Sequence, residues 1–103
     1  MAKPAPQKPS NLPRALQLLG QTITVKIVPE GEWPDDDKVG FWFPQRCEIL
    51  IRADRPEQVQ MQVFFHELVH CILENMGKDK LSEDEAFVDM FGSLLQQAWN
   101  TIK

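Results

Sequence analysis

The longest stretch of helix-compatible residues runs from about residue 57 to residue 76 and contains no internal Gly or Pro. Gly77 follows it and is well placed to act as a left-handed helix cap. A helix that is apolar on almost every side is expected in the centre of a domain. The apolar residues that predict such a buried central helix are Val63, Phe64, Phe65, Leu68, Val69, Ile72 and Leu73.

A second helix is predicted to begin at Ser82, where a serine precedes an acidic and then apolar segment. Its apolar residues recur at helical spacing, so we expect them to form a buried stripe. That predicted stripe comprises Phe87, Phe91, Leu94, Leu95, Ala98 and Ile102.

The strand pattern lies before these helices. Residues 22–28 alternate with β-branched side chains, as a half-buried strand does. Residues 39–43 and 47–52 are two β-rich runs at hairpin spacing. Residues 14–19 read as a short helix-compatible segment that ends at Gly20. We therefore predict an α+β fold, with a small antiparallel sheet of about three strands packed on the central helix and the C-terminal helix.

The length of 103 residues predicts one domain. Residues 1–13 are rich in Pro and Lys and read as a flexible tail, which leaves residues 14–103 for the domain. Residues 30–38 contain Gly, Pro and three consecutive aspartates, a composition typical of a solvated loop.

Charge and hydropathy narrow the range of partners. A formal charge of -4 and a pI near 5.1 argue against a nucleic-acid binder. The sequence shows neither a signal peptide nor an apolar run long enough to cross a bilayer, so we expect no membrane association and a cytoplasmic protein. The two cysteines, Cys47 and Cys71, form no Cys-x-x-Cys pair and are expected to be buried free thiols; Cys71 remains a minor alternative metal ligand because it follows His70.

The central helix carries both histidines of the chain in the motif His66-Glu67-Leu68-Val69-His70. Each helical residue advances about 100°, so His66 and His70 lie about 40° apart and can bind one metal ion together. Glu67 lies about 60° from His70, close enough to contact a water at that metal without being a ligand. A buried His-Glu-His set would be costly without a partner. The motif therefore predicts one zinc ion, with Glu67 as general base.

A catalytic zinc site needs a third protein ligand and one open position. Glu85 and Asp89 share a face of the second predicted helix, and we predict Glu85 as the ligand and Asp89 as the carboxylate that orients an imidazole. Ser82-x-x-Glu85 is also a capping-box pattern, in which Glu85 would bond to the backbone of Ser82. Antiparallel helices would bring Asp89 level with His70, and only crossed packing or a loop that leans back would deliver Glu85. Asp89 and Glu83 thus remain alternative ligands.

The motif at residues 66–70, together with Glu85-Ala86-x-x-Asp89-x-Phe91 and an upstream sheet, resembles a minimal gluzincin-type zincin. The likeness covers roughly residues 39–95 and is closer to the small ImmA/IrrE-type metallopeptidases of phages and mobile elements. It implies His66, His70 and Glu85 as zinc ligands and Glu67 as general base and acid. It also implies that a strand such as the one containing residues 41–43 holds an extended substrate by backbone pairing.

The chain departs from larger members of that family in two ways. The spacer between His70 and Glu85 is short, and no tyrosine or further histidine is present to stabilise an oxyanion. Zinc, a backbone amide or an arginine such as Arg46 would have to take that role. We therefore expect slow or narrowly directed proteolysis.

Three functions follow from these observations. The first is a zinc endopeptidase that acts on one particular cytoplasmic protein. The second is a catalytically weak or inactive zinc-binding module that has kept the fold and acts by protein binding. The third is a zinc-free helical interaction protein in which exposed Trp33 or Trp42 makes the contacts. The sequence leaves the oligomeric state open.

Overall fold

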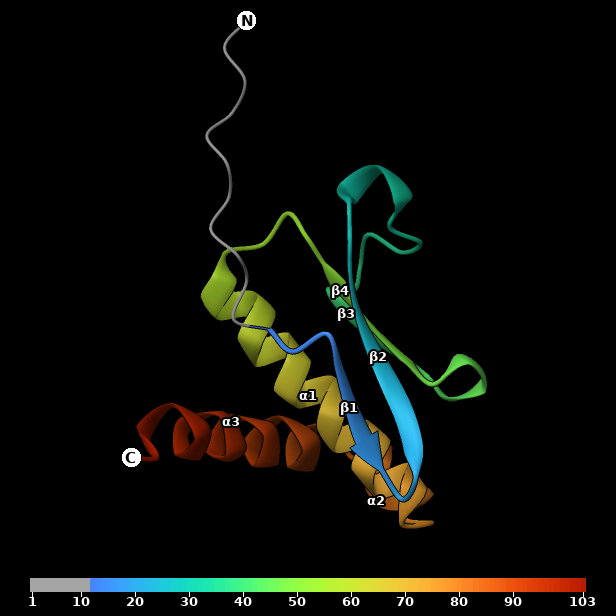
Figure 1. Cartoon of the computed structure of the whole chain (residues 1–103), viewed down its shortest axis with the longest axis vertical. Helices are drawn as coiled ribbons and strands as arrows, with labels where there is room; N and C mark the ends of the chain where they lie inside the picture. The colour runs from blue at the N-terminus through green and yellow to red at the C-terminus, as the bar shows by residue number, and fades with distance from the viewer. Residues whose placement is uncertain (1–11) are drawn as a thin grey trace, which may run out of the picture.

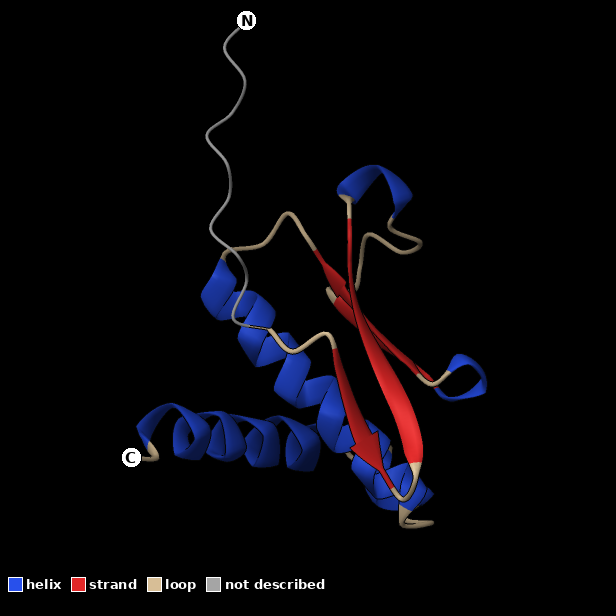
Figure 2. Cartoon of the chain, in the orientation of Figure 1, coloured by secondary structure: helices blue, strands red, loops and turns tan. Residues whose placement is uncertain are grey.

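Four β-rich segments and one long apolar helix build the α+β fold that the sequence predicts. The computed structural model describes residues 12–103 (Figure 1). Helix α1 packs along the sheet and α3 crosses α1, as the secondary-structure colouring also shows (Figure 2). In chain order the strands and α-helices are β1 Ala15–Leu18, β2 Gln21–Val28, β3 Gly40–Phe43, β4 Glu48–Arg52, α1 Glu57–Asn75, α2 Asp79–Ser82 and α3 Glu85–Thr101.

The sheet is mixed and has four strands in the order β1-β2-β4-β3. The predicted hairpin is confirmed, because β3 and β4 pair antiparallel with Trp42 opposite Ile49. The predicted all-antiparallel arrangement is wrong, since β2 pairs parallel to β4. The chain leaves β2 through a long loop and enters β3 first, so β4 returns beside β2 and β3 becomes an edge strand.

The segment predicted as helix-compatible before Gly20 is instead strand β1, which pairs antiparallel with β2. Leu19 and Gly20 connect the two strands with φ values of 50° and 78°, the left-handed geometry of a tight hairpin turn. A helix of six residues is too short to be stable alone. In the strand, Leu16 and Leu18 alternate with exposed residues and pack on the core.

Helix α1 is confirmed as the central element, and Gly77 follows it with a φ of 74°. The core lies between α1 and the sheet and is formed by Ile23, Val25, Ile49, Ile51, Val63, Phe64, Phe65 and Cys71. Leu12 also belongs to this core, although we predicted it in the tail. Residues 1–11 of that predicted tail lie outside the described residues.

Helix α3 begins later and buries less than the sequence predicts. Ser82 ends the one-turn helix α2, while Asp84 caps α3 by accepting a hydrogen bond from the Phe87 amide at 3.1 Å. The helix crosses α1 (Figure 1), so only its side toward α1 is covered. Val88 and Gly92 are buried and Leu95 partly so, whereas four residues of the predicted stripe are exposed: Phe91, Leu94, Ala98 and Ile102. None of the helices in residues 12–103 is long and apolar enough to cross a membrane.

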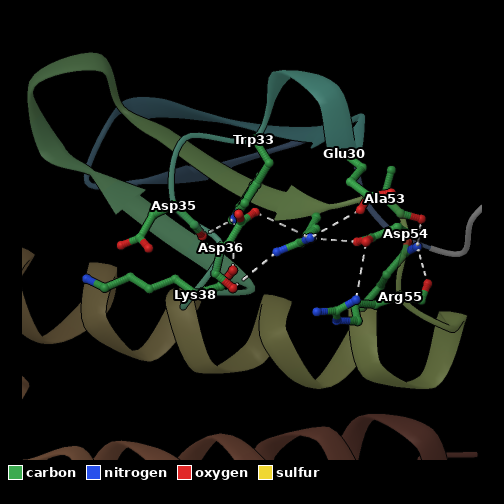
Figure 3. A network of polar contacts seen from close by, with 10 residues as sticks. Glu30, Trp33, Asp35, Asp36, Lys38, Ala53, Asp54 and Arg55 are labelled. Carbon is green, nitrogen blue, oxygen red and sulfur yellow. Dashed lines mark hydrogen bonds and ion pairs between the residues drawn. The ribbon is translucent and has the colours of Figure 1, made fainter.

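The loop between β2 and β3, predicted as a solvated loop, is held in place by buried side chains. Arg52, which is 5% exposed, bonds Asp54 at 2.7 Å and the Asp36 carbonyl at 3.3 Å, and lies 3.7 Å from Glu30 (Figure 3). Trp33 is buried, and its indole N–H is shared between the carbonyls of Asp35 at 2.7 Å and Lys38 at 2.8 Å. The interpretation of Trp33 as an exposed contact residue is therefore wrong. This anchoring fixes Lys38 just before β3.

Candidate metal centre

The two histidines of α1 point the same ring nitrogen at one another. Nε2 of His66 lies 3.2 Å from Nε2 of His70, and both side chains are partly buried. The one-turn spacing predicts this convergence. A tetrahedral zinc ion with nitrogens at 2.0–2.1 Å holds two of them roughly 3.3 Å apart, so the pair already has the separation that a shared ion requires.

Glu85, the first residue of α3, completes the cluster. One carboxylate oxygen lies 3.1 Å from His66 Nε2 and the other lies 3.2 Å from His70 Nε2. The crossed packing of α3 on α1 brings Glu85 to this point, and the alternative capping box of Ser82 and Glu85 does not form because Asp84 caps the helix. His66, His70 and Glu85 thus form a group that can hold a metal ion.

The outer nitrogens of both imidazoles have acceptors. Asp89 lies one turn beyond Glu85, and its carboxylate is 2.7 Å from His66 Nδ1, the contact predicted for an orienting residue. Ser82 Oγ lies 2.8 Å from His70 Nδ1, a contact that the sequence interpretation missed. The serine was read as a helix cap, and only the folded turn at α2 shows its side chain buried beside His70.

Hydrogen bonding of this kind decides which nitrogens are free. A carboxylate only accepts hydrogen bonds, so Asp89 holds the His66 proton on Nδ1 and leaves a lone pair on Nε2. Ser82 does the same for His70, because its own proton goes to Glu74 at 2.9 Å. The two Nε2 atoms and the Glu85 carboxylate then converge as one donor set. Two imidazoles with one carboxylate are ligands that suit zinc.

Glu67 lies on the sheet side of the cluster and is 8% exposed. Burial raises the pKa of its carboxyl to about 7; nearby Glu85 adds to the rise, while His66 and Lys38 oppose it. Gly40 on β3 allows α1 to approach here, since a Cβ there would clash with the Val63 side chain and stand 3.2 Å from Glu67 Cγ. The carboxyl group therefore has a proton affinity suited to transfer near neutral pH.

Burial also separates the remaining titratable groups. It lowers the pKa of His70, which favours the neutral imidazole that binds metal, although Glu85 opposes the shift. Burial raises the pKa of the Cys71 thiol to about 11, and Cys71 is fully buried. A thiol that resists ionisation on the inner side of α1 is a poor ligand. Both cysteines are free, as predicted, but Cys47 is only partly buried.

The cluster opens into a cavity of about 620 Å³ between α1, α3 and β3. Among the described residues that line it, Lys38 is the only lysine or arginine, and its ammonium lies 5.1 Å from the centre of the Phe41 ring. Arg46, the predicted cation, does not line the cavity, and its guanidinium lies 4.0 Å from Glu48 instead. Sequence spacing carried no signal for Lys38, because the anchored loop sets its position.

The arrangement can hold a divalent cation beside a carboxyl group of near-neutral pKa at the side of an open cavity. A search for known relatives adds no family to this description: no protein-family model, characterised protein or solved structure matches the chain significantly.

Proposed function

We propose that His66, His70 and Glu85 hold one zinc ion and that the chain hydrolyses peptide bonds, as its resemblance to ImmA/IrrE-type metallopeptidases implies. The observation that carries the proposal is the approach of the two Nε2 atoms to 3.2 Å, with each Nδ1 in contact with a side-chain oxygen of Asp89 or Ser82. The geometry of the site supports the metal ion, and the resemblance is the basis for peptide hydrolysis.

Zinc bound there would supply a water molecule of lowered pKa and polarise a substrate carbonyl. Glu67 takes the proton of the attacking water and passes it to the leaving amine, a role that suits its pKa of about 7. Lys38 lines the same cavity and offers a positive charge to the oxygen on which negative charge develops. Asp89, one turn further along α3, keeps His66 in the ligating orientation.

The proposed substrate is an extended segment of a cytoplasmic protein. Within residues 12–103, β3 has only β4 as a sheet neighbour, so its outer edge has backbone groups available for a peptide strand. Gly40, Phe41 and Trp42 of β3 line the cavity that contains Glu67. A peptide paired along this edge would pass the histidines.

The second candidate function is a zinc-binding module that acts by protein binding and has little or no activity. It is favoured by the chain's lack of tyrosine and by the presence of one lysine, Lys38, among the described residues that line the cavity, which leave few groups for an oxyanion. A zinc-free interaction protein is disfavoured by the convergent donor set.

Two measurements test these functions. Protein purified without chelator should contain about one zinc per chain, and His66→Ala should lose it; a wild-type chain without zinc would overturn both zinc proposals. Cleavage of a library of quenched fluorescent peptides then separates enzyme from module. We expect turnover by the wild type and a loss of about 10²–10⁴-fold in Glu67→Gln with zinc retained. Equal signals from both proteins would leave the binding module as the function.

A further inference from the structure

Ser82 has one proton to donate, and the structure shows where it goes. Its hydroxyl donates to Glu74 Oε2 at 2.9 Å, and a carboxylate can only accept. The same oxygen lies 2.8 Å from His70 Nδ1 and must therefore accept the imidazole proton. Ser82 is 5% exposed, so water has little access to replace either bond.

Glu74 is itself held from its far side. Its second oxygen, Oε1, accepts a hydrogen bond from the indole N–H of Trp42 at 3.2 Å. An indole nitrogen only donates, so every bond in this series has a fixed direction. The series joins the edge strand β3 through α1 and the turn of α2 to a proposed metal ligand.

We infer that Glu74 and Ser82, with Trp42 bonded to the far oxygen of Glu74, form a positioning relay that keeps His70 in the tautomer whose Nε2 can bind metal. The inference rests on the proposed metal centre, because only a metal makes that tautomer necessary. None of the three residues touches the metal. Residues that orient a ligating histidine typically change metal affinity by 10–100-fold, which is large enough to measure.

The fixed directions give Glu74→Gln an unusual consequence. Trp42 still donates, so it holds the carbonyl oxygen of the new amide toward itself and turns the NH₂ group toward Ser82. Ser82 then accepts from that amide and loses the acceptor of its own proton, which in this buried turn is satisfied by donation to His70 Nδ1. That pairing places the imidazole proton on Nε2, where it blocks the metal.

Removal of the indole should undo this effect. In Trp42→Phe with Glu74→Gln, no donor holds the amide, so it can rotate and present its carbonyl oxygen to Ser82. The correct tautomer then returns. A packing role for these residues predicts the opposite, because two damaged positions would bind metal no better than one.

The test measures zinc affinity by competition with a chromophoric chelator for four proteins: wild type, Trp42→Phe, Glu74→Gln and the double variant. We expect a loss of about 10–100-fold for Glu74→Gln, a loss within about threefold for Trp42→Phe, and a double variant that binds more tightly than Glu74→Gln. Ser93→Ala is the matched control, since Ser93 lines the same cavity and should leave affinity unchanged.

The outcomes separate the two proposals. If the wild type binds no zinc, the metal centre itself fails. If the wild type binds zinc and Glu74→Gln binds it equally well, or the double variant binds more weakly than Glu74→Gln, the relay is wrong and the metal centre stands. Thermal unfolding of each metal-free variant checks folding, and Ser82→Ala, which leaves His70 Nδ1 without its acceptor, gives an independent reading with an expected loss of at least tenfold.

Discussion

Gly92 of α3 lies against the backbone of His66 in α1: a Cβ at position 92 would stand 3.3 Å from both the Cα and the nitrogen of His66. This close approach lets the two helices cross at the metal-binding turn. The crossing in turn places Glu85 and Asp89 on opposite sides of the His66 ring, one near each nitrogen. The geometry of the cluster therefore depends on a residue that has no side chain.

Gly92→Val should force α3 away from α1. We expect the free energy of unfolding to fall by about 1–3 kcal/mol, as in other overpacked contacts, and zinc affinity to fall with it because Glu85 moves. Chemical denaturation and zinc competition measure the two effects. Gly31→Val is the control, since nothing lies within 4 Å of a Cβ at position 31. Unchanged zinc affinity in a destabilised Gly92→Val protein would show that the crossing does not position the ligands.

The two acidic residues of α3 should differ in their effects on metal binding. Glu85→Ala removes a proposed ligand and should abolish near-stoichiometric zinc binding. Asp89→Ala removes only the acceptor of the His66 proton and should reduce affinity by about 10–100-fold. Glu83→Ala, the control at the third candidate carboxylate, should bind zinc as the wild type does. Calorimetric titration with zinc ranks the three variants, and a larger loss in Asp89→Ala than in Glu85→Ala would reverse the assigned roles.

Helical spacing predicts which residues of this site lie together on one helix. His66, Glu67 and His70 lie within one turn of a helix whose apolar pattern is unambiguous, and Asp89 follows Glu85 by one turn. The prediction of Glu85 as the ligand left Asp89 and Glu83 as alternatives, because spacing does not show whether the two helices pack antiparallel or crossed. Trp42 and Glu74 were missed because they lie 32 residues apart, and no periodicity relates a strand to the far end of a helix.

The differences between the predicted and the observed fold also arise from contacts between elements. Residues 15–18 became a strand because β2 offered an edge and a tight turn was available at Leu19 and Gly20. The exposed part of the predicted α3 stripe, such as Leu94 at 58%, reflects the crossing angle rather than helical periodicity. A pattern of apolar residues tells which side chains share a face, but only the packing of whole elements tells which face is covered.

Glu67 should make the metal-free protein less stable at high pH. Its pKa is about 7 in the folded chain and 4.5 is its ordinary value, so the folded state holds a proton that the unfolded state releases between these limits. The unfolded state binds fewer protons there, and stability falls as the pH rises from about 4.5 through 7. Glu67→Gln should remove this dependence. At pH 8 its free energy of unfolding should exceed that of the wild type by up to about 3 kcal/mol, and at pH 4 it should show no such gain.

Urea unfolding with a chelator present measures that difference. Glu83→Gln is a comparison variant that should lack the effect, because Glu83 is exposed and is not among the charges that shift the pKa of Glu67. A gain of equal size at pH 4 and pH 8 would mean that the stabilisation comes from packing rather than from the buried charge.

Lys38 is the cation that we expect to matter for turnover. Its charge lowers the pKa of Glu67, so Lys38→Met should raise that pKa and shift the acidic limb of the kcat/KM profile to higher pH. It should also reduce kcat, since the developing oxyanion loses a positive neighbour, while zinc affinity stays within about twofold because Lys38 is no ligand. Lys26→Met is the control, because Lys26 pairs with Glu48 and does not line the cavity. A lower kcat with an unshifted pH profile would place Lys38 at the substrate but away from Glu67. A wild-type profile in both kcat and pH dependence would remove it from the reaction and leave zinc and backbone amides as the groups that face the oxyanion.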